Sequence, residues 1–417
     1  MQTDRNLGLR RFLTGGRRID HVSAVGESPR ASRTGAAPEV MVVGELPRHL
    51  PLLSSNPSLH RRWALGDSRL SSTMPPPAAD FANGSSDLLV DMYTFVKSSL
   101  VFTDPPDHTR LRRLVIAAFV PTVINELAKP ISMITNRLLD EHRDSLDLAA
   151  HLAQPMPIAV LGQLLGVSLS EAEGAQLKRW CDDFLLPFGR DIRTLSPDEL
   201  ARVKSAGAGL HEFVDTVLSH HGTANGTDDV VGRLLAGESS DRLSEQELFA
   251  NIVLLLIAGH ENSTSLIGNG AAMLLGLPEV RRELARNPSR WPAAIEELMR
   301  LVSPNQFIRR PALEDVVLGD QTIRAGDALL LILAAANRDP EAFPEPDRFI
   351  FDRPNRQNVA LGHGIHYCLG APLARLEGRI ALQTVFERWP TIRQSGVFVY
   401  ADNFNVRILR SLPVATS

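Results

Sequence analysis

The sequence has little cysteine, no long apolar run and little net charge, and each shortage excludes a class of protein. Only 2 of the 417 residues are cysteine, which excludes a disulfide framework and favours a reducing, cytoplasmic compartment. The longest uncharged apolar stretch, near residue 255, falls far short of the about 20 residues that span a bilayer. The net charge of -4 gives no basic footprint for nucleic acid. We therefore expect neither a nucleic-acid nor a membrane partner.

The chain nevertheless has enough apolar material for a large core, since 44% of its residues are hydrophobic. Residues 1–38 stand apart because they carry seven arginines against three acids, with scattered glycine and serine. A transit peptide is one interpretation of this segment. The acids are atypical of a transit peptide, so we favour a basic, disordered tail. No internal repeat or linker divides residues 39–417, which we expect to form a single domain.

Helical periodicity dominates the chain up to about residue 302, and short β-like runs follow after residue 305. Helices are predicted at residues 106–119, 122–143, 154–166, 171–186, 197–219, 244–276, 279–286 and 290–302. Strands are predicted at residues 40–43, 315–319, 328–332, 397–400 and 406–409, and one more helix follows Cys368. This layout predicts a mainly α fold with a minor antiparallel β sheet, of the α+β class.

Cys368 lies in a glycine-punctuated loop, residues 361–370, that runs directly into a helical pattern. Gly362 and Gly364 allow the backbone to turn where a side chain would collide with a flat ligand. A helix start lowers the pKa of a nearby thiol, so we expect the sulfur to be ionised and to bind a metal. A single thiolate without a second cysteine or paired histidines is a poor zinc site, but it is the axial ligand of haem-thiolate oxygenases. Cys181, in contrast, is expected to be a buried, inert thiol.

The longest predicted helix, residues 244–276, opens with a capping box formed by Ser244 and Glu247. At about 1.5 Å per residue the helix is about 50 Å long. Its apolar middle runs straight into the polar segment 259–264, Gly-His-Glu-Asn-Ser-Thr. Polar groups at the centre of a buried helix are costly unless they have partners or a chemical role. Taken alone, such a segment is more often a structural hydrogen-bond network.

Two further pairs of residues have helical spacing. His108 and Arg112 are four residues apart, so they share one face of a helix and form a pair of donors that suits a carboxylate. Two neighbouring arginines favour the alternative, which is a solvated basic edge. Glu297 and Arg300 are three residues apart, and exposed pairs of this kind contribute little.

Taken in order along the chain, these motifs resemble the cytochrome P450 superfamily, in its soluble bacterial type. The resemblance runs from Phe102 to Val414. It implies the triangular P450 fold, with residues 39–417 as a single haem-thiolate catalytic domain. It also implies haem b, which is iron protoporphyrin IX, as the cofactor, with Cys368 as the ligand of the metal and Gly362 beside the haem.

The resemblance implies roles for the polar segment of the central helix. Ala258 and Gly259 match the small pair that leaves room for dioxygen, and Glu261 matches the acid that relays protons for oxygen cleavage. Asn262 departs from the pattern, because the family usually has threonine there and an amide cannot relay a proton as a hydroxyl does. Three accounts stay open. Asn262 orders a water that Glu261 feeds, or Ser263 or the substrate supplies the hydroxyl, or the enzyme does not perform ordinary hydroxylation.

The resemblance further implies contacts with the haem propionates and a buried scaffold around the cysteine loop. Guanidinium groups suit carboxylates, and the matching positions are held by His108, Arg112, Arg310 and His366. The scaffold positions, which are structural rather than catalytic, are held by Glu297, Arg300 and Arg348. Leu361 replaces the usual phenylalanine at the start of the loop, a change that can alter the environment of the sulfur.

These implications predict a monooxygenase that takes electrons from a separate ferredoxin or flavodoxin and its reductase. The expected reaction is hydroxylation or epoxidation of a mostly apolar small molecule, such as a secondary-metabolite intermediate. By analogy the substrate pocket would draw on residues 75–100, 184–188, the central helix, 305–308 and 403–404. Asn262 suggests an alternative, oxidative coupling or cyclisation without net oxygen insertion. A non-catalytic haem-thiolate sensor would need an output module, and the sequence shows none. We expect a monomer in the cytoplasm.

Overall fold

A computed structural model describes residues 40–43, 64–73, 87–140, 142, 145–189, 195–222, 230–235, 242–318, 321–355, 357–403 and 405–417. The predicted tail at residues 1–38 lies outside the described residues. The chain forms two compact units. We call Met1–Leu70 with Gly270–Ile365 the sheet unit, and Ser71–Asn269 with His366–Ser417 the thiol unit.

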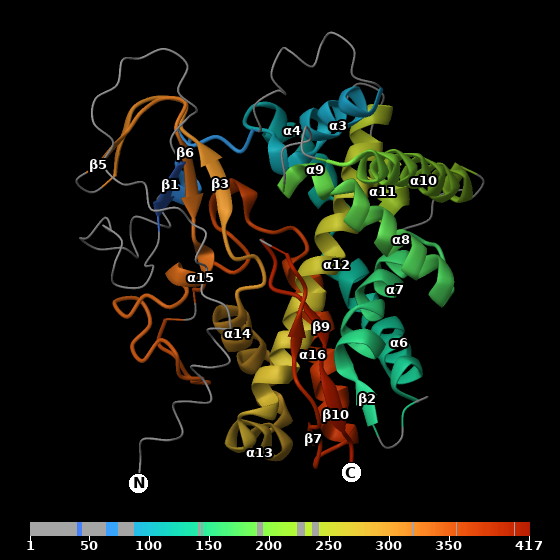
Figure 1. Ribbon diagram of the computed structural model, residues 1–417, viewed down its shortest axis with the longest axis vertical. Helices are drawn as coiled ribbons and strands as arrows, with labels where there is room; N and C mark the ends of the chain where they lie inside the picture. The colour runs from blue at the N-terminus through green and yellow to red at the C-terminus, as the bar shows by residue number, and fades with distance from the viewer. Residues whose placement is uncertain are drawn as a thin grey trace. The chain divides into compact units, whose positions relative to one another are not determined.

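The thiol unit consists mainly of packed helices (Figure 1). Helix α6 packs on α7 and α16, α8 packs on α7 and α10, and each buries an apolar face in doing so. In chain order the helices are α3 (Asp87–Ser98), α4 (Asp107–Ile116), α5 (Pro121–Glu126), α6 (Ala128–Asp140), α7 (Pro155–Leu164), α8 (Glu171–Phe184), α9 (Leu186–Gly189), α10 (Pro197–Gly222), α11 (Val230–Leu235) and α16 (Ala371–Arg388). Short turns η2 (Leu100–Phe102) and η3 (Ala149–Ala153) connect some of them.

Helix α12 (Glu245–Leu275) is the central helix that the sequence predicts, and it belongs to both units. The capping box forms as expected. The Ser244 hydroxyl accepts from the Glu247 amide at 3.2 Å, and the Glu247 carboxylate accepts from the Ser244 amide at 2.9 Å. Ile252 and Leu256 are fully buried. The helix ends before Pro278, which starts the next helix and could not have continued this one.

The sheet unit contains a mixed three-stranded sheet. Strand β1 (Val40–Val43) runs parallel to β6 (Ala328–Leu331), and β6 pairs antiparallel with β3 (Ile308–Pro311). Strands β4 (Val316–Leu318) and β5 (Gln321–Ile323) form an antiparallel ladder. Inward-facing side chains such as Leu329, Leu331, Val316 and Ile323 form one buried cluster. The helices of this unit are α13 (Pro278–Arg286), α14 (Trp291–Val302) and α15 (Leu333–Ala336), with the turns η5 (Pro288–Arg290) and η6 (Gly364–His366), the latter ending in the thiol unit.

Two small antiparallel sheets complete the thiol unit. Strand β10 (Pro413–Ala415) pairs with β2 (Ser145–Asp147) and β7 (Arg393–Gln394), and β8 (Val399–Tyr400) pairs with β9 (Leu409–Ser411). The mainly α prediction with small, mostly antiparallel sheets is confirmed, and the parallel β1–β6 pair is an addition to it.

Two of the predicted elements were wrong in detail. The single helix predicted at residues 122–143 is two helices, α5 and α6. Pro130 lies in the first turn of α6, where its missing amide costs no hydrogen bond, whereas it would interrupt a continuous helix. The strand predicted at residues 406–409 begins only at Leu409.

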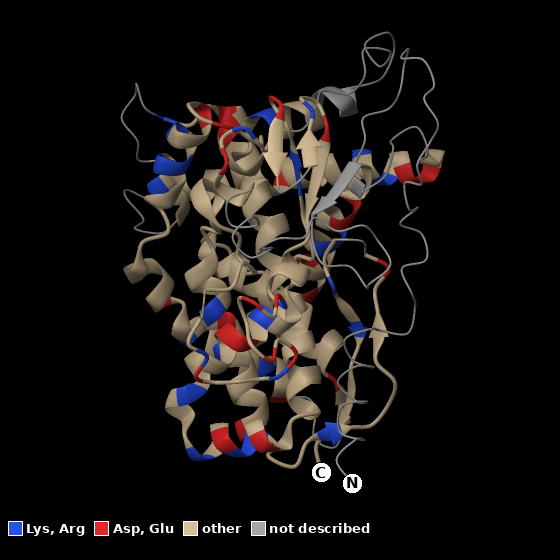
Figure 2. Ribbon diagram, turned by 90° about the vertical axis from the view of Figure 1, so that its left-hand side faces the viewer, with Lys and Arg blue, Asp and Glu red and all other residues tan. Residues whose placement is uncertain are grey.

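None of the described helices is long and apolar enough to cross a membrane alone. Among the described residues, one pair of helices passes the test of length and composition when taken together, Asp107–Ile116 with Pro121–Asp140, and the two are bent by 48°. Acidic and basic residues are interspersed along the ribbon in Figure 2.

Candidate active site

Cys368 lies just before helix α16, whose N-cap is Gly370. Burial raises the pKa of this thiol above its ordinary value, and the Gly370 amide, Arg375 and Arg112 only partly offset the effect. The Gly370 amide thus acts as expected of a helix start, and burial opposes it. A sulfur that accepts an amide hydrogen bond beside two guanidinium groups fits a metal ligand, because a bound cation supplies the remaining stabilisation of the thiolate.

Two histidine rings lie side by side here, His366 in the cysteine loop and His108 on α4. His108, on α4, is 1% exposed, and its Nε2 atom has no hydrogen-bond partner among the described residues. Its ring centroid lies 4.2 Å from that of His366, whose Nε2 lies 2.7 Å from the Ser72 hydroxyl. Burial, and then Arg112, lower the pKa of His108. A buried imidazole nitrogen without a partner is costly, so this atom fits a polar group of a cofactor, as a haem propionate would provide.

Arg112 is one turn from His108 on α4, and its guanidinium donates to the Tyr367 carbonyl at 2.7 Å. The structure thus brings His108, Arg112, His366 and Cys368 together in the thiol unit, as the sequence predicts. Two further cofactor candidates, Arg310 and Gly362, belong to the sheet unit, and the last two, Ala258 and Gly259, to the thiol unit.

Arg310 is 8% exposed on β3, and its guanidinium donates to the Arg309 carbonyl at 3.2 Å. Gly362 has a φ of 77°, which favours glycine, and its amide donates to the Val359 carbonyl at 2.9 Å. Gly364 is equally constrained, because its φ is 73° and a Cβ there would lie 3.1 Å from the Gly66 Cα. Gly362 and Gly364 are therefore both needed by the backbone.

Helix α12 presents Ala258 and Gly259 at the start of its polar segment. Ala258 is exposed although the helix around it is largely buried, so its face of the helix borders open space. A Cβ at Gly259 would lie 2.8 Å from a Leu161 methyl group. The structure thus gives Gly259 a packing role against α7, which the sequence analysis did not foresee.

The polar segment contains several buried atoms without partners among the described residues. They include Asn262 Oδ1, Thr264 Oγ1 and His260 Nε2. The Asn262 amide nitrogen donates to the Ala258 carbonyl at 3.3 Å, within its own helix. Its oxygen remains an available acceptor, as an ordered water or a substrate hydroxyl would require.

Ser263 is 3% exposed, and its hydroxyl donates to the carboxylate of Glu377 on α16. Burial raises the pKa of Glu377 to about 8, and the Ser263 hydrogen bond only partly offsets this. The pair links the central helix to the helix that follows Cys368. Glu377 is not among the residues predicted from the sequence, although a carboxylate on an otherwise apolar face of α16 was a signal for it.

Glu261 lies next to these residues on α12 and is partly buried. Burial raises its pKa, and so does the nearby Asp182 carboxylate. The Asn403 amide donates to its carboxylate at 3.5 Å. A raised pKa favours the protonated form of this acid, which suits the predicted role in proton relay.

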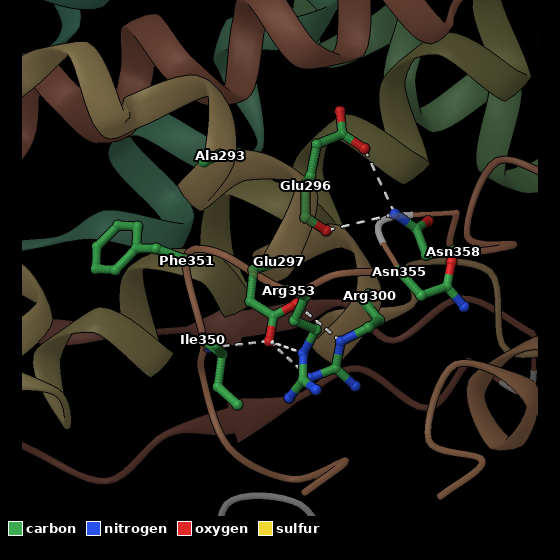
Figure 3. Close-up of a pocket in the computed structure, with 9 residues that line it drawn as sticks. All are labelled: Ala293, Glu296, Glu297, Arg300, Ile350, Phe351, Arg353, Asn355 and Asn358. Atoms are coloured by element: carbon green, nitrogen blue, oxygen red, sulfur yellow. Dashed lines mark hydrogen bonds and ion pairs between the residues drawn. The ribbon is translucent and has the colours of Figure 1, made fainter. Parts of the chain in front are cut away.

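The predicted scaffold of Glu297, Arg300 and Arg348 is wrong in its third member. Arg300 donates two hydrogen bonds to Glu297, at 2.8 and 2.9 Å, and the second arginine on this carboxylate is Arg353, at 2.7 Å (Figure 3). The Arg348 side chain is 67% exposed and pairs with Glu345, while its carbonyl accepts hydrogen bonds from Arg300 and Arg353. Arg348 turns outward, and Arg353, five residues later, is the second arginine on Glu297.

Part of the predicted substrate pocket is an aromatic cluster in the thiol unit. The Phe95 ring makes edge contacts with Phe184 and Phe188, with centroids 5.2 and 6.1 Å apart. Phe102 stacks on Phe188 at 5.9 Å. Residues 75–86 and residue 404 of the predicted pocket lie outside the described residues. The four phenylalanine rings make this cluster apolar.

The fold is mainly helical, Cys368 lies at a helix start, and beside it lies the buried His108, whose Nε2 atom has no hydrogen-bond partner among the described residues. These features fit a haem-thiolate site. The sequence pattern of the family described as cytochrome P450 matches residues 291–396. Cytochrome P450 CYP107DY1 of Priestia megaterium is 39% identical over 324 residues, which is 76% of each chain. Mycinamicin IV hydroxylase/epoxidase of Micromonospora griseorubida is 38% identical over 305 residues, 72% of this chain and 74% of the relative.

The solved structure of P450BioI, in complex with an acyl carrier protein that carries hexadec-9Z-enoic acid, superposes with a TM-score of 0.76. It is 31% identical and covers 86% of this chain and 90% of its own. The chain belongs to the cytochrome P450 family. It is a P450 monooxygenase with haem b as its cofactor, and it uses dioxygen, a substrate and electrons from a redox partner.

Proposed function

We propose that this monooxygenase hydroxylates or epoxidises a mostly apolar small molecule, such as an intermediate of secondary metabolism. The observation that carries the proposal is Cys368 at the start of α16, with the Gly370 amide directed at its sulfur. Haem bound through that sulfur supplies the reductive activation of dioxygen. The aromatic cluster around Phe95 supports an apolar substrate, and the relative named mycinamicin IV hydroxylase/epoxidase supports this reaction class.

In this proposal the side chains around Cys368 would hold the haem. Its propionates would be held by His108, Arg112 and His366 of the thiol unit, and Arg310 of the sheet unit stays a further candidate. The unpartnered Nε2 atom of His108 and the charge of Arg112 support the first two assignments. Gly362 lets the cysteine loop turn beside the haem, and the exposed face at Ala258, next to Gly259, leaves room for dioxygen.

Protons for oxygen cleavage come from α12 and α16 in this proposal. Glu261 supplies one route, because burial raises its pKa and so favours its protonated form. Glu377 and Ser263 supply a second, since a carboxyl with a pKa of about 8 is largely protonated near pH 7 and contacts the Ser263 hydroxyl. Asn262 orders water between these routes through its free oxygen.

The test is the absorption spectrum of the reduced protein under carbon monoxide, for the wild type and for Cys368→Ala. The wild type is expected to show the red-shifted Soret band of a thiolate-ligated haem, and Cys368→Ala to lose it. Cys181→Ala is the matched control, because Cys181 is fully buried and has a pKa raised by burial, so its thiol is inert. A red-shifted Soret band that persists in Cys368→Ala would show that Cys368 is not the ligand of the haem iron.

The electrons are proposed to come from a ferredoxin or flavodoxin and its reductase, in a monomeric, cytoplasmic enzyme. Arg112 and Arg375 near Cys368 support an acidic partner, because positive charge steers such proteins. Residues 39–417 are proposed to form one catalytic domain, which the continuous helix α12 shared by both units supports. Turnover with a purified ferredoxin but not without one would test the partner.

Oxidative coupling or cyclisation is a second candidate, favoured by the amide of Asn262 at the usual threonine position. The side-chain nitrogen of Asn262 donates a hydrogen bond to the Ala258 carbonyl, and an amide has no hydroxyl proton to deliver. Turnover under isotope-labelled dioxygen separates the two candidates. A labelled product supports hydroxylation or epoxidation, and an unlabelled oxidised product supports coupling.

A further inference from the structure

A second group of side chains with metal-ligating atoms lies beside the proposed proton route. Asp182 on α8 and His260 and Glu261 on α12 each offer one ligand atom, and these atoms all lie within 4.8 Å of one another. We call this the Asp182–His260–Glu261 cluster. The Asp182 side chain is 43% exposed, which gives an ion access from solvent, while His260 is 1% exposed.

The orientation of His260 is what distinguishes this cluster from an ordinary group of acids. Its Nδ1 atom lies 2.9 Å from the Leu256 carbonyl, and because a carbonyl only accepts, Nδ1 must carry the hydrogen. In the neutral ring Nε2 then has a free lone pair. That atom is buried without a hydrogen-bond partner among the described residues and lies 3.6 Å from Asp182 Oδ1. A histidine fixed by a carbonyl on one nitrogen, with the other directed at ligands, is the usual state of a metal ligand.

The spacing of the ligand atoms suits a small cation. A tetrahedral ion with bonds of about 2.0–2.2 Å places its ligands about 3.3–3.6 Å apart. The His260–Asp182 separation of 3.6 Å already meets this requirement. Lys178 holds the other oxygen of Asp182, Oδ2, at 2.5 Å, and so leaves Oδ1 for the ion. One imidazole and two carboxylates are a zinc ligand set, with water in the fourth position.

We propose that Asp182, His260 and Glu261 form a binding site for Zn²⁺, separate from the haem iron. Binding joins α8 to α12 and occupies the carboxylate of Glu261. Because Glu261 then cannot carry a proton, zinc inhibits turnover reversibly. The zinc site stands on geometry alone, whereas its inhibitory effect rests on the proton route proposed for Glu261.

The test is calorimetric titration of haem-loaded protein with zinc chloride at near-neutral pH, for the wild type and His260→Asn. This variant is closely matched, because Asn262 and Asn269 on the same helix donate to the carbonyls four residues back, at 3.3 and 3.0 Å. An asparagine at position 260 can therefore keep the Leu256 hydrogen bond while losing Nε2. We expect one zinc ion per wild-type chain and an affinity at least about tenfold weaker in His260→Asn.

A second histidine pair, His142 and His151, has ring centroids 4.0 Å apart and is the competing zinc site. His142→Asn is therefore the control and is expected to bind zinc as the wild type does. Asp182→Asn, at an exposed position, provides a second loss-of-ligand variant if His260→Asn fails to hold haem. Unchanged affinity in His260→Asn and Asp182→Asn, or no wild-type binding up to about 1 mM zinc, would overturn the site.

The inhibitory half is measured separately, as turnover at each zinc concentration divided by the zinc-free rate of the same variant. Inhibition is expected over the same concentration range as binding and is expected to be reversed by a chelator. Zinc that binds through His260 without slowing turnover would overturn the inhibition and the proton route through Glu261 together, and would leave the zinc site standing.

Discussion

Glu297 in the sheet unit and Glu377 in the thiol unit are both buried carboxylates, yet their surroundings differ completely. Glu297 is 5% exposed and accepts hydrogen bonds from Arg300, Arg353 and the Ile350 amide. Burial opposes its ionisation, but these donors prevail and lower its pKa. Glu377 is 1% exposed, has the Ser263 hydroxyl as its one hydrogen-bond partner among the described residues, and has its pKa raised to about 8 by burial.

The difference shows how one residue type serves two purposes. A buried carboxylate between two guanidinium groups is held as a charge and ties loop to helix. A buried carboxylate with one neutral donor keeps its proton near neutral pH and can release it to a neighbour. Glu297 is therefore part of the scaffold, and Glu377 is a candidate proton donor. Three substitutions test this contrast.

The largest effect is expected from Glu297→Gln. Loss of the charge leaves two buried guanidinium groups without a counterion, which costs about 3–5 kcal/mol in the free energy of unfolding. Urea denaturation of the haem-loaded protein measures it. Arg348→Ala is the matched control, because that side chain is 67% exposed, and a change within about 0.5 kcal/mol is expected. A loss in Arg348→Ala as large as in Glu297→Gln would return Arg348 to the scaffold.

Glu377→Gln is expected to have a smaller effect whose size depends on pH. The folded-state pKa of about 8 lies above the ordinary value of 4.5, so the folded protein binds this proton more tightly than the unfolded chain. The stability that this group contributes is fully present below about pH 4.5 and is lost as pH rises toward about 8, by at most about 1.4 kcal/mol per pH unit. Glutamine does not titrate.

Thermal unfolding across this pH range compares the two proteins. Wild-type stability should fall relative to Glu377→Gln as pH rises, so the variant gains on the wild type. Parallel curves would mean that Glu377 is ionised in the folded protein, and the contrast with Glu297 would disappear.

The sequence could predict features that depend on local spacing. The capping box set the start of α12, Pro278 set its end, and the glycines at 362 and 364 indicated a turn that the backbone does require. Features set by distant contacts could not be predicted. Nothing in an irregular loop indicates that Arg353 rather than Arg348 reaches Glu297, because no periodicity fixes the direction of either side chain.

The site itself shows the same limit. Ser263 and Glu377 are 114 residues apart in the chain, so their hydrogen bond has no local signature. The pKa of Cys368 shows the same limit. A helix start is visible in the sequence, but the burial that outweighs it is produced by the whole fold. The electrostatics of a buried group therefore follows from tertiary packing more than from its neighbours in sequence.

The smallest effect on stability is expected from Ser263→Ala. Near pH 7 Glu377 is mostly protonated, so the variant loses a neutral hydrogen bond worth about 1 kcal/mol. The Ser263 hydroxyl lowers the pKa of Glu377, so its removal raises that pKa further. The unfolding free energy of Ser263→Ala should therefore fall further behind the wild type at about pH 9 than at about pH 6.

Ser263→Thr retains a hydroxyl and should follow the wild type at both pH values. Turnover is a second measurement, and a purely structural role of Ser263 would leave it unchanged. If Glu377 delivers protons through Ser263, Ser263→Ala slows turnover by about tenfold or more, and Ser263→Thr restores it. A deficit in stability that is equal at both pH values, with unchanged turnover, would reduce the Ser263–Glu377 pair to packing. Glu377 would then be a buried acid without a role in proton delivery. It would differ from Glu297 in charge state alone.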